Sequence, residues 1–586
     1  MGVVWWMSPC VAWAPLASGG ALLAAGAVVW LVLAYRWYGR RIERRLVEPT
    51  DAPTPAHAQR DNVDFTPTQP IVLFGHHFAS IAGAGPIVGP VLAVAFFGWG
   101  PTVLWVLLGV VFIGAVHDYL ALMVSVRNRG ASVGDIARSC VSPAARVLFL
   151  VFVWIGLVLV ITCFCNAATD TFLDAPEIVV PTFALMLIAV LFGVLNYLLR
   201  VNTAVNTGIA LALLLGAICL GFWLKVDLRA LGVSGEWVRR VWLLILIGYG
   251  LLASVLPVWV LLQPRDYLAT WILVIGMTLG FAGIFTQAPS LHAPAFAAAV
   301  AKPGPVWPML FIIVACGAVS GFHCLVAGGT TSKQLGGERQ GLGVGYGAML
   351  TEGALAIMAV VCVAGGLYYA AVPEGAEGFA LLPTLAPGGG GPIAAFGRGF
   401  GALTSPFLRP IGLWLGVERL GMIIGTTMVN AFVMTTLDTS VRLSRFITTE
   451  LAGEKAPVFR NRLVASAVPV VPAFLLAMSP GAFNRIWQLF GASNQLIAAL
   501  ALLVITAYLL KRRKPTLYTL VPAVFMLATT MAALAWQAYG YLFQAERRDI
   551  VLGATAVVLL GLAATMAAMA WRASRTLTSS ASRECC

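Results

Sequence analysis

Apolar runs long enough to cross a lipid bilayer recur along nearly the whole chain, separated by short polar stretches. A membrane-spanning helix needs roughly 20 predominantly apolar residues. We therefore expect an all-α polytopic membrane protein with about fifteen transmembrane helices. The expected spans are 19–37, 72–98, 102–126, 143–165, 180–199, 203–224, 239–262, 267–287, 308–328, 345–371, 409–435, 461–480, 486–510, 516–539 and 549–572.

The charge distribution predicts the orientation of these spans. The 586 residues are 60% hydrophobic and 10% charged, with a formal net charge of +13. Such a charge can indicate nucleic-acid binding, but the basic residues gather in short loops beside apolar spans, where positive-inside sorting explains them. The main basic loops, 36–45, 127–138, 442–462 and 511–514, fall on one side of the membrane. We expect that side to be cytoplasmic, with a periplasmic N-terminus, a cytoplasmic C-terminus and no nucleic-acid partner.

One expected span contains helix-breaking residues in its middle. The stretch GHHFASIAGAGPIVGP at 75–90 holds two histidines, four glycines and two prolines. Hydrocarbon offers no water to free backbone groups, so a broken helix persists only against protein or a water-filled cavity. The span 239–262, five spans later, also holds potential breakers in Gly248, Gly250 and Pro257. Paired interruptions at this offset predict a five-plus-five inverted-repeat core with discontinuous helices.

This repeat divides the chain into six parts. Residues 47–70 are rich in Pro, Asp and Thr and are expected to form a cytoplasmic linker outside the core. Residues 373–407, rich in Gly and Pro, are expected to form one long external loop. The expected parts are 1–46, an N-terminal helix with a basic flank; 47–70, the linker; 71–225 and 226–446, the two five-helix repeats; 447–572, four C-terminal helices; and 573–586, a cytoplasmic tail.

Ionisable residues inside the apolar spans are the candidates for chemistry. His117 and Asp118 lie about halfway along one span, and Ser320 and His323 lie late in another. A charged side chain at the bilayer centre costs roughly 2.5–3.5 kcal/mol on insertion scales, so such groups usually face a cavity or a partner. Histidine suits proton coupling because it titrates near physiological pH. Hydrogen-bonded packing between helices is the alternative for each histidine, and a histidine-liganded metal or redox centre is a less favoured one.

Further polar residues lie towards the predicted cytoplasmic ends of the spans. Thr330 can supply an oxygen ligand, Lys333 is placed at the cytoplasmic mouth, and Glu352 is placed about two turns into the next helix, near the surface. Asp438 and Arg442 stand four residues apart, a spacing suited to an ion pair on one helix face. We expect these charged groups to act at a gate.

Seven motifs give the chain a specific resemblance. They run in order from GHHFASIAGAGPIVGP (75–90) through AVHDYLA (115–121), LPVWVLLQPRDYL (256–268), SGFHCLVAGGTTSK (320–333), GYGAMLTEG (345–353) and TTLDTSVRLSRF (435–446) to FGASNQL (490–496). The chain thereby resembles the carbon starvation protein A family of bacterial inner-membrane transporters. The resemblance implies uptake of pyruvate or short peptides during carbon limitation, and a leucine-transporter-like core.

The expected mechanism is proton symport by alternating access, with no cofactor beyond the coupling ion and no enzymatic activity. A carboxylate would bind where broken helices expose N-terminal N–H groups. A sodium-coupled symporter using Ser320 and Thr330 is the main alternative, and the choice between pyruvate and peptide and the oligomeric state stay open. The candidate residues are, for substrate, His76, His77, Gly83, Gly85, Gly248 and Gly250; for the coupling ion or proton, His76, His117, Asp118, Ser320, His323 and Thr330; and for the gate, Lys333, Glu352, Asp438 and Arg442.

Overall fold

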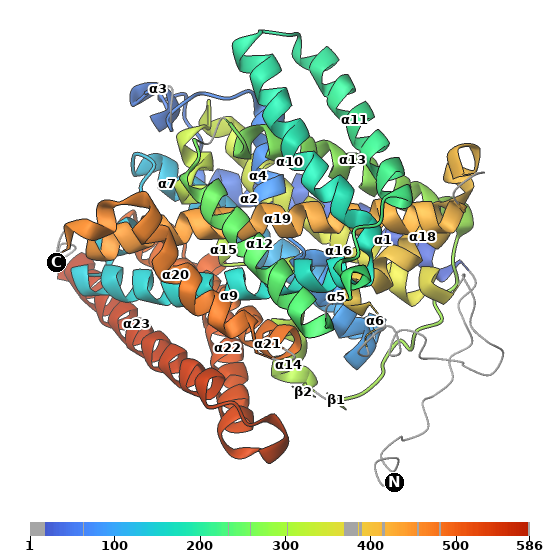
Figure 1. Ribbon diagram of the computed structural model, residues 1–586. Coiled ribbons are helices and arrows are strands. Elements are labelled where there is room, and N and C mark those ends of the chain that lie inside the picture. The colour runs from blue at the N-terminus through green and yellow to red at the C-terminus, as the bar shows by residue number, and fades with distance from the viewer. Residues whose placement is uncertain are drawn as a thin grey trace.

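The computed structural model is a bundle of long helices around two central ones, α9 and α19, which run side by side through it (Figure 1). It describes residues 18–61, 64–232, 234–257, 260–301, 303–368, 385, 390–412, 416–453, 456–479 and 482–583. The first part of the bundle contains α1 (Gly19–Leu33), α2 (Arg40–Ile42), α3 (Pro55–Ala58), α4 (Pro70–Ile81), α5 (Gly85–Phe97), α6 (Trp99–Gly109), α7 (Ala115–Arg127), α8 (Val133–Cys140), α9 (Pro143–Asp174), α10 (Val179–Gly193), α11 (Thr203–Trp223) and α12 (Gly235–Val255). The second part contains α13 (Leu262–Gln287), β1 (Val300–Ala301), β2 (Gly304–Pro305), α14 (Val306–Val314), α15 (Phe322–Gly329), α16 (Ala348–Ala364), α18 (Gly391–Gly412), α19 (Val417–Ala452), α20 (Arg462–Ala477), α21 (Ala482–Lys511), α22 (Leu517–Phe543) and α23 (Ile550–Arg583). The two strands form one short antiparallel hairpin in which Val300 faces Pro305.

The polytopic helical class is confirmed. Within the described residues, 13 helices are long and apolar enough to cross a membrane, and the count reaches 14 when the bent pair Pro70–Ile81 and Gly85–Phe97 is taken as one span. The shorter apolar helix Arg462–Ala477 corresponds to the expected span 461–480. Every expected span therefore has a helical counterpart, because long apolar runs in membranes must satisfy their backbone hydrogen bonds internally.

The first helix break lies where the sequence predicts it, and the second does not. α4 and α5 meet at a 45° bend after Ile81. α12, in contrast, runs unbroken through Gly248 and Gly250 and ends at Val255. The expectation of a broken span there is wrong, because glycine is frequent in membrane helices and does not by itself break one.

The second break instead interrupts the apolar segment Val306–Lys333. α14 ends at Val314, a 3₁₀ turn follows at Ala315–Gly317, and α15 begins at Phe322. In the order of the spans, the two breaks stand seven spans apart rather than five. The five-plus-five inverted repeat therefore loses the interruption on which it rested and stays a prediction.

The two broken segments cross in direct backbone contact. A Cβ placed on Gly89 would lie 2.7 Å from the carbonyl oxygens of Ile313 and Val314. A Cβ on Gly85 would lie 2.5 Å from the Cβ of Cys316. Glycine at these positions lets α5 pack against the end of α14 and the turn after it, as small residues do at close helix crossings in membranes.

We expect Gly89→Ala to destabilise the protein by about 1–3 kcal/mol, because the added methyl group must push apart two fixed backbone segments. Thermal unfolding of the purified protein in detergent measures the effect. Gly248→Ala is the matched control, since a Cβ there meets nothing within 4 Å. A Gly89→Ala variant as stable as the Gly248→Ala variant would contradict the close crossing.

The expected external loop at 373–407 is in part a helix. Its described residues from Gly391 onward belong to the 22-residue helix α18, whereas 373–384 and 386–389 lie outside the described residues. A Cβ on Gly399 would overlap the carbonyl of Cys362, and one on Gly401 would lie 2.5 Å from the carbonyl oxygen of Glu418. The glycines that suggested a loop serve close helix packing instead.

The expected linker at 47–70 is docked onto the helices in its described residues. Thr54 is buried and its hydroxyl donates to the carbonyl of Leu335 at 2.6 Å. The backbone N–H of Thr68 donates to the carbonyl of Gln334 at 3.0 Å. These contacts fasten the segment to the turn after α15, which its polar composition did not indicate.

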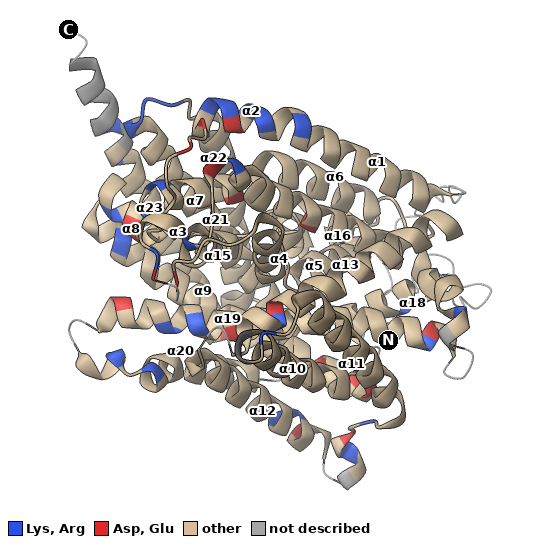
Figure 2. Ribbon diagram, turned by 90° about the horizontal axis from the view of Figure 1, so that it is seen from above, with Lys and Arg blue, Asp and Glu red and all other residues tan. Residues whose placement is uncertain are grey.

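Lys and Arg residues gather towards one end of the bundle, at α2, α8 and the turn between α19 and α20 (Figure 2). The arginines of α2 and those at 442–462 belong to loops that the sequence placed on one side of the membrane. This end is called the basic end below.

Candidate functional site

The break between α4 and α5 lies beside the long central helices. A Cβ placed on Gly83 would lie 2.7 Å from the hydroxyl oxygen of Thr436 on α19 and 3.5 Å from the ring of Phe164 on α9. The Thr436 hydroxyl is buried and has no hydrogen-bond partner within the described part of the chain. The break therefore brings a buried hydroxyl without a described partner next to non-helical backbone.

A chain of buried titratable groups lies next to the crossing of the broken helices. Asp118 on α7 contacts two imidazoles, because its Oδ1 lies 2.7 Å from His117 Nδ1 and its Oδ2 lies 2.7 Å from His323 Nδ1. The Nε2 of His323 lies 3.4 Å from Oε2 of Glu352 on α16. All four side chains are fully buried. The structure thus brings together His117, Asp118 and His323, which the sequence grouped, and adds Glu352. We call these four residues the carboxylate–imidazole chain.

The placement of Glu352 near the surface is wrong. The preceding π-helical turn at Leu342–Gly347 and the helix α16 carry it to a fully buried position beside His323. Burial of an unpaired carboxylate is costly unless a proton or a cation neutralises it. The carboxylate–imidazole chain contains two carboxyl groups and two imidazoles, so protonation sets the net charge of a fully buried site.

His77 joins the same region from α4. Its Nδ1 lies 2.8 Å from the hydroxyl of Thr331, and both side chains are fully buried. The adjacent Thr330 instead donates to the carbonyl of Val326 within its own helix. Ser320 donates to Oδ1 of Asn494 on α21 at 3.3 Å. The hydroxyls of Ser320 and Thr330 therefore both have hydrogen-bond partners within the protein.

Asn494 holds the second break in place. Its Oδ1 also accepts the backbone N–H of Phe322 at 2.9 Å, the first residue of α15. Its backbone carbonyl accepts the N–H of Gly321 at 3.0 Å. The side chain and backbone carbonyl of Asn494 thus satisfy backbone N–H groups that the break leaves free.

A second buried ionic group lies at the start of α13 and contains an arginine that the sequence analysis missed. Arg265 is fully buried, donates to Asp266 Oδ1 at 2.7 Å and pairs with Asp438 of α19. Tyr249 of α12 donates to Oδ2 of Asp438 at 2.8 Å. His76 completes the group, with Nδ1 3.4 Å from Asp266 Oδ2. The signal for this group was the adjacent Arg-Asp pair in QPRDYL, at the start of an apolar span.

The expected ion pair between Asp438 and Arg442 is not formed. Asp438 faces Arg265 and Tyr249, whereas Arg442 donates to the backbone carbonyls of Ala253 and Leu256 at 2.9 and 2.6 Å. A buried carboxylate gains more from a fully buried arginine and a phenol than from a partly exposed arginine one turn away.

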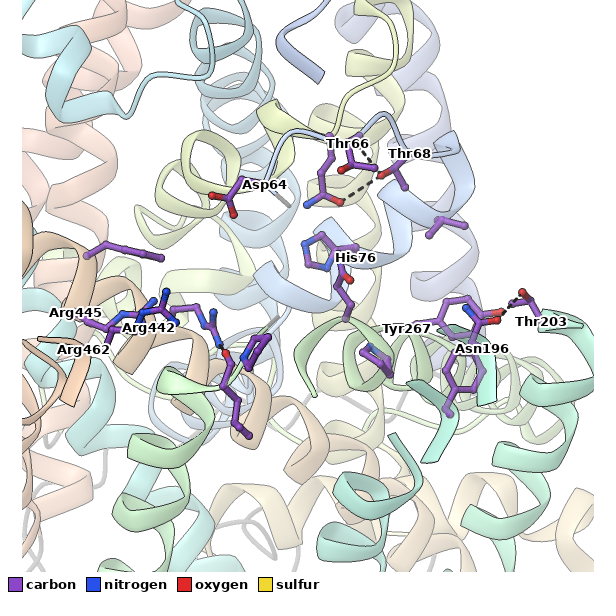
Figure 3. Close-up of a pocket in the computed structure, with 18 of the residues that line it drawn as sticks. Asp64, Thr66, Thr68, His76, Asn196, Thr203, Tyr267, Arg442, Arg445 and Arg462 are labelled. Atoms are coloured by element: carbon purple, nitrogen blue, oxygen red, sulfur yellow. Dashed lines mark hydrogen bonds between the residues drawn. The ribbon is translucent and has the colours of Figure 1, made fainter. Parts of the chain in front are cut away.

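A cavity of about 970 Å³ lies between the docked segment before α4 and the turn joining α19 to α20, at the basic end (Figure 3). His76 lies in its middle, with Arg442, Arg445 and Arg462 to one side. Lys333, placed at this mouth by the sequence, lies over the ring of Phe65 at 5.4 Å. The cavity, called the vestibule below, lies next to the second ionic group, because His76 lines it and its Nδ1 lies 3.4 Å from Asp266 Oδ2.

Of the remaining candidates, Gly248 faces open space and Gly250 packs against Val441 of α19. Neither lies at a break, so neither offers free backbone groups, and only Gly250 contributes helix packing. Among the described residues, no three His, Cys, Asp or Glu side chains are grouped so as to hold a metal ion.

The fold and the site together define a class. Discontinuous helices that cross inside a helical bundle, beside buried ionisable groups, are the architecture of secondary membrane transporters. The family model described as "Carbon starvation protein CstA" matches residues 19–378 and 389–533. The chain belongs to the carbon starvation protein CstA family, as the seven motifs indicated.

Similar proteins in several bacteria have names that agree with this class. The "Peptide transporter CstA" of Escherichia coli (strain K12) is 34% identical, over 88% of this chain and 80% of that protein. The "Pyruvate/proton symporter BtsT" of the same organism is 34% identical, over 88% of this chain and 81% of that protein. The "Peptide transporter CstA" of Bacillus subtilis (strain 168) is 32% identical, over 90% and 93%. The chain is a membrane transporter of nutrients and not an enzyme.

A solved structure with a weaker likeness is MhsT in complex with L-phenylalanine, at 13% identity and a TM-score of 0.46, over 85% of this chain and 99% of that chain.

Proposed function

We propose that this chain imports a small carboxylate nutrient, pyruvate or a short peptide, across the bacterial inner membrane together with a proton. The observation that carries the proposal is the fully buried carboxylate–imidazole chain beside the crossing of the two broken helices. Relatives named as a pyruvate/proton symporter and as peptide transporters support the substrate class.

The proton step uses this chain. Asp118 holds two imidazoles at 2.7 Å, so a proton taken up by His323 is stabilised on one side by Asp118 and on the other by Glu352. Adding one proton offsets one negative charge in a fully buried site, where uncompensated charge is most costly. Protonation therefore favours the conformation in which the site is closed and dry.

The substrate carboxylate is proposed to bind at the break between α4 and α5. Pro86 lacks an N–H, and the N–H groups of Ile87 and Val88 donate to the carbonyl of Ala84. The start of α5 therefore offers an anion the N–H of Gly85 and the positive end of the helix dipole. Gly83 lies beside Thr436, whose hydroxyl has no partner in the described residues, whereas Gly85 is packed against Cys316. His77 and Gly83 thus keep their proposed place at the site, and the side of Gly85 where a side chain would lie serves the close crossing with Cys316.

The basic end is proposed to be cytoplasmic, by the positive-inside rule. On this orientation the vestibule is proposed to open to the cytoplasm, which corresponds to an inward-facing arrangement. At the other end, ion pairs of Arg239 with Asp170 and of Arg419 with Glu177 join separate helices. These pairs are proposed to close the periplasmic side and to separate when the substrate enters.

Uptake of labelled pyruvate into proteoliposomes under an imposed pH gradient tests the proposal. Symport of one anion with one proton is electroneutral, so a gradient of one pH unit should accumulate pyruvate up to about ten-fold above equilibrium. A protonophore should abolish the accumulation, and replacing sodium by potassium should leave it unchanged.

The competitors decide the substrate. Inhibition of labelled pyruvate uptake by unlabelled pyruvate but not by alanylalanine assigns pyruvate, and the reverse pattern with labelled alanylalanine assigns a peptide. Accumulation that requires sodium, or uptake that never exceeds equilibrium, would overturn proton symport.

A further inference from the structure

The vestibule carries an excess of positive charge. Four arginines line it, Arg442, Arg445, Arg460 and Arg462, and Asp64 is the one acidic side chain among its described lining residues. None of the four arginines has a carboxylate partner in the described part of the chain. Arg442, Arg445 and Arg460 donate to backbone carbonyls instead, as Arg445 does to Ser254 at 2.6 Å. A carbonyl carries only a partial charge, so the arginines keep most of their attraction for an anion.

Positive-inside sorting alone does not account for this arrangement. Sorting requires basic residues in cytoplasmic loops, but it does not require them to line one cavity or to be buried. Arg445 is only 6% exposed, and Arg442 is half-buried with an Nε atom that has no partner in the described residues. Opposite the arginines, the lining supplies neutral hydrogen-bonding groups, among them Thr66, Asn196 and Gln334.

The size and position of the vestibule fit a small organic anion. Its volume of about 970 Å³ lies at the upper end of the range of small-molecule sites, which leaves room for a dipeptide or for pyruvate with its water shell. His76, 16% exposed, lies between the vestibule and the buried Asp266, so an anion there stands next to the second ionic group. A cavity lined by one sign of charge raises the local concentration of the opposite ion.

We propose that the vestibule is a second, cytoplasmic anion-binding site, which takes the carboxylate of the transported nutrient and sets the affinity for transport from the cytoplasmic face. The inference rests on the proposed function for its substrate class and its orientation. It makes the protein asymmetric: the vestibule arginines act on substrate at the basic end and not on substrate arriving from the opposite face.

The test compares the two faces of one membrane. Right-side-out and everted membrane vesicles are prepared from cells that express the full chain, and the initial rate of transport of labelled pyruvate, or of labelled alanylalanine where pyruvate is not carried, is measured against concentration. The variant is the double substitution Arg460→Gln and Arg462→Gln, because both side chains are exposed and can be changed without disturbing the core.

We expect the KM from the cytoplasmic face to rise about five-fold, the size of effect that two charges within about 8 Å exert on an anion in a partly hydrated site. The KM from the periplasmic face should not change. Raising the ionic strength should weaken the wild type in everted vesicles and should have little effect on the variant, because salt screens the attraction.

Arg512→Gln is the matched control. Arg512 belongs to another basic loop and lies over the ring of Tyr508, outside the vestibule. It removes one positive charge by the same Arg→Gln change without altering the cavity, so both KM values should stay at the wild-type level.

The possible outcomes distinguish the vestibule site from a phosphate site and from a failure of the proposed proton coupling. Equal changes of KM on both faces, or none on either, would overturn the vestibule site. Stronger inhibition by orthophosphate than by unlabelled substrate, relieved in the double variant, would assign the arginines to phosphate groups and overturn the carboxylate assignment. A KM change confined to the cytoplasmic face in vesicles that show no proton-driven accumulation would leave the vestibule standing while the proposed proton coupling fails.

Discussion

Asp118→Asn should abolish accumulation of substrate while leaving exchange of substrate intact. Asparagine has the shape of a protonated aspartate, and it can still hydrogen-bond the two imidazoles that lie 2.7 Å from Asp118. It cannot gain or lose a proton. The loaded carrier therefore keeps cycling between the two faces of the membrane, but no step releases the proton that would drive net import.

The measurement is made on proteoliposomes in two modes. Under a gradient of one pH unit, accumulation should fall from about ten-fold to unity. In counterflow, with unlabelled substrate inside and no gradient, labelled substrate should enter at a rate near that of the wild type. Retained counterflow also demonstrates that the variant is folded.

Asp135→Asn is the control for this substitution. Asp135 on α8 pairs with Arg146 at 3.0 Å, and its side chain is 46% exposed. The same chemical change there should leave both modes unaltered. If Asp118→Asn accumulates substrate as the wild type does, the carboxylate–imidazole chain does not carry the coupled proton.

The sequence predicted the membrane topology well, because hydrocarbon imposes one simple requirement. Runs of apolar residues have to form helices that satisfy their own backbone, so their number and approximate positions can be read locally. The break after Ile81 was predictable for the same reason, since glycine and proline are concentrated there. The break at Ala315–Gly317 was not, because its small residues resemble ordinary helix-packing residues in a membrane span.

Side-chain partners were harder to predict, since they depend on contacts between distant segments. The sequence grouped His117, Asp118 and His323 because each is an ionisable residue inside an apolar run. It placed Glu352 near the surface, because the depth of Glu352 was judged from its position along the expected helix, without the π-helical turn Leu342–Gly347 that precedes α16. Asp438 was paired with Arg442, the nearest opposite charge on the same helix, whereas the partner in the fold is Arg265 from a helix 173 residues earlier.

Arg265→Gln should be among the most destabilising single substitutions in this chain. It removes the cation that faces both Asp266 and Asp438 in a fully buried site. Breaking a buried ion pair by removing one partner costs about 3–5 kcal/mol, because the remaining charge is left without compensation. Equilibrium unfolding of the protein in detergent measures the loss, and transport should fall with it.

The surface offers a matched control for this loss. Arg229 makes a pair of the same chemistry with Asp227 at 2.9 Å, with side chains 48% and 35% exposed. Because solvent screens that pair, Arg229→Gln should cost no more than about 1 kcal/mol. Equal losses at the two positions would show that burial does not strengthen the Arg265 pairs.

A double-mutant cycle separates the observed partner of Asp438 from the one expected from its spacing. When Asp438→Asn is combined with Arg265→Gln, the second change removes a charge that has already lost its partner. The stability lost by the double variant should therefore be about 1–3 kcal/mol smaller than the sum of the losses of the two single variants. Combined with Arg442→Gln, Asp438→Asn should give nearly additive losses, since Arg442 binds the carbonyls of Ala253 and Leu256. Coupling to Arg442 and additivity with Arg265 would reverse the assignment. The four-residue spacing would then identify the partner of Asp438 correctly. Arg265 would no longer link Asp438 to Asp266, the carboxylate that His76 contacts from the vestibule.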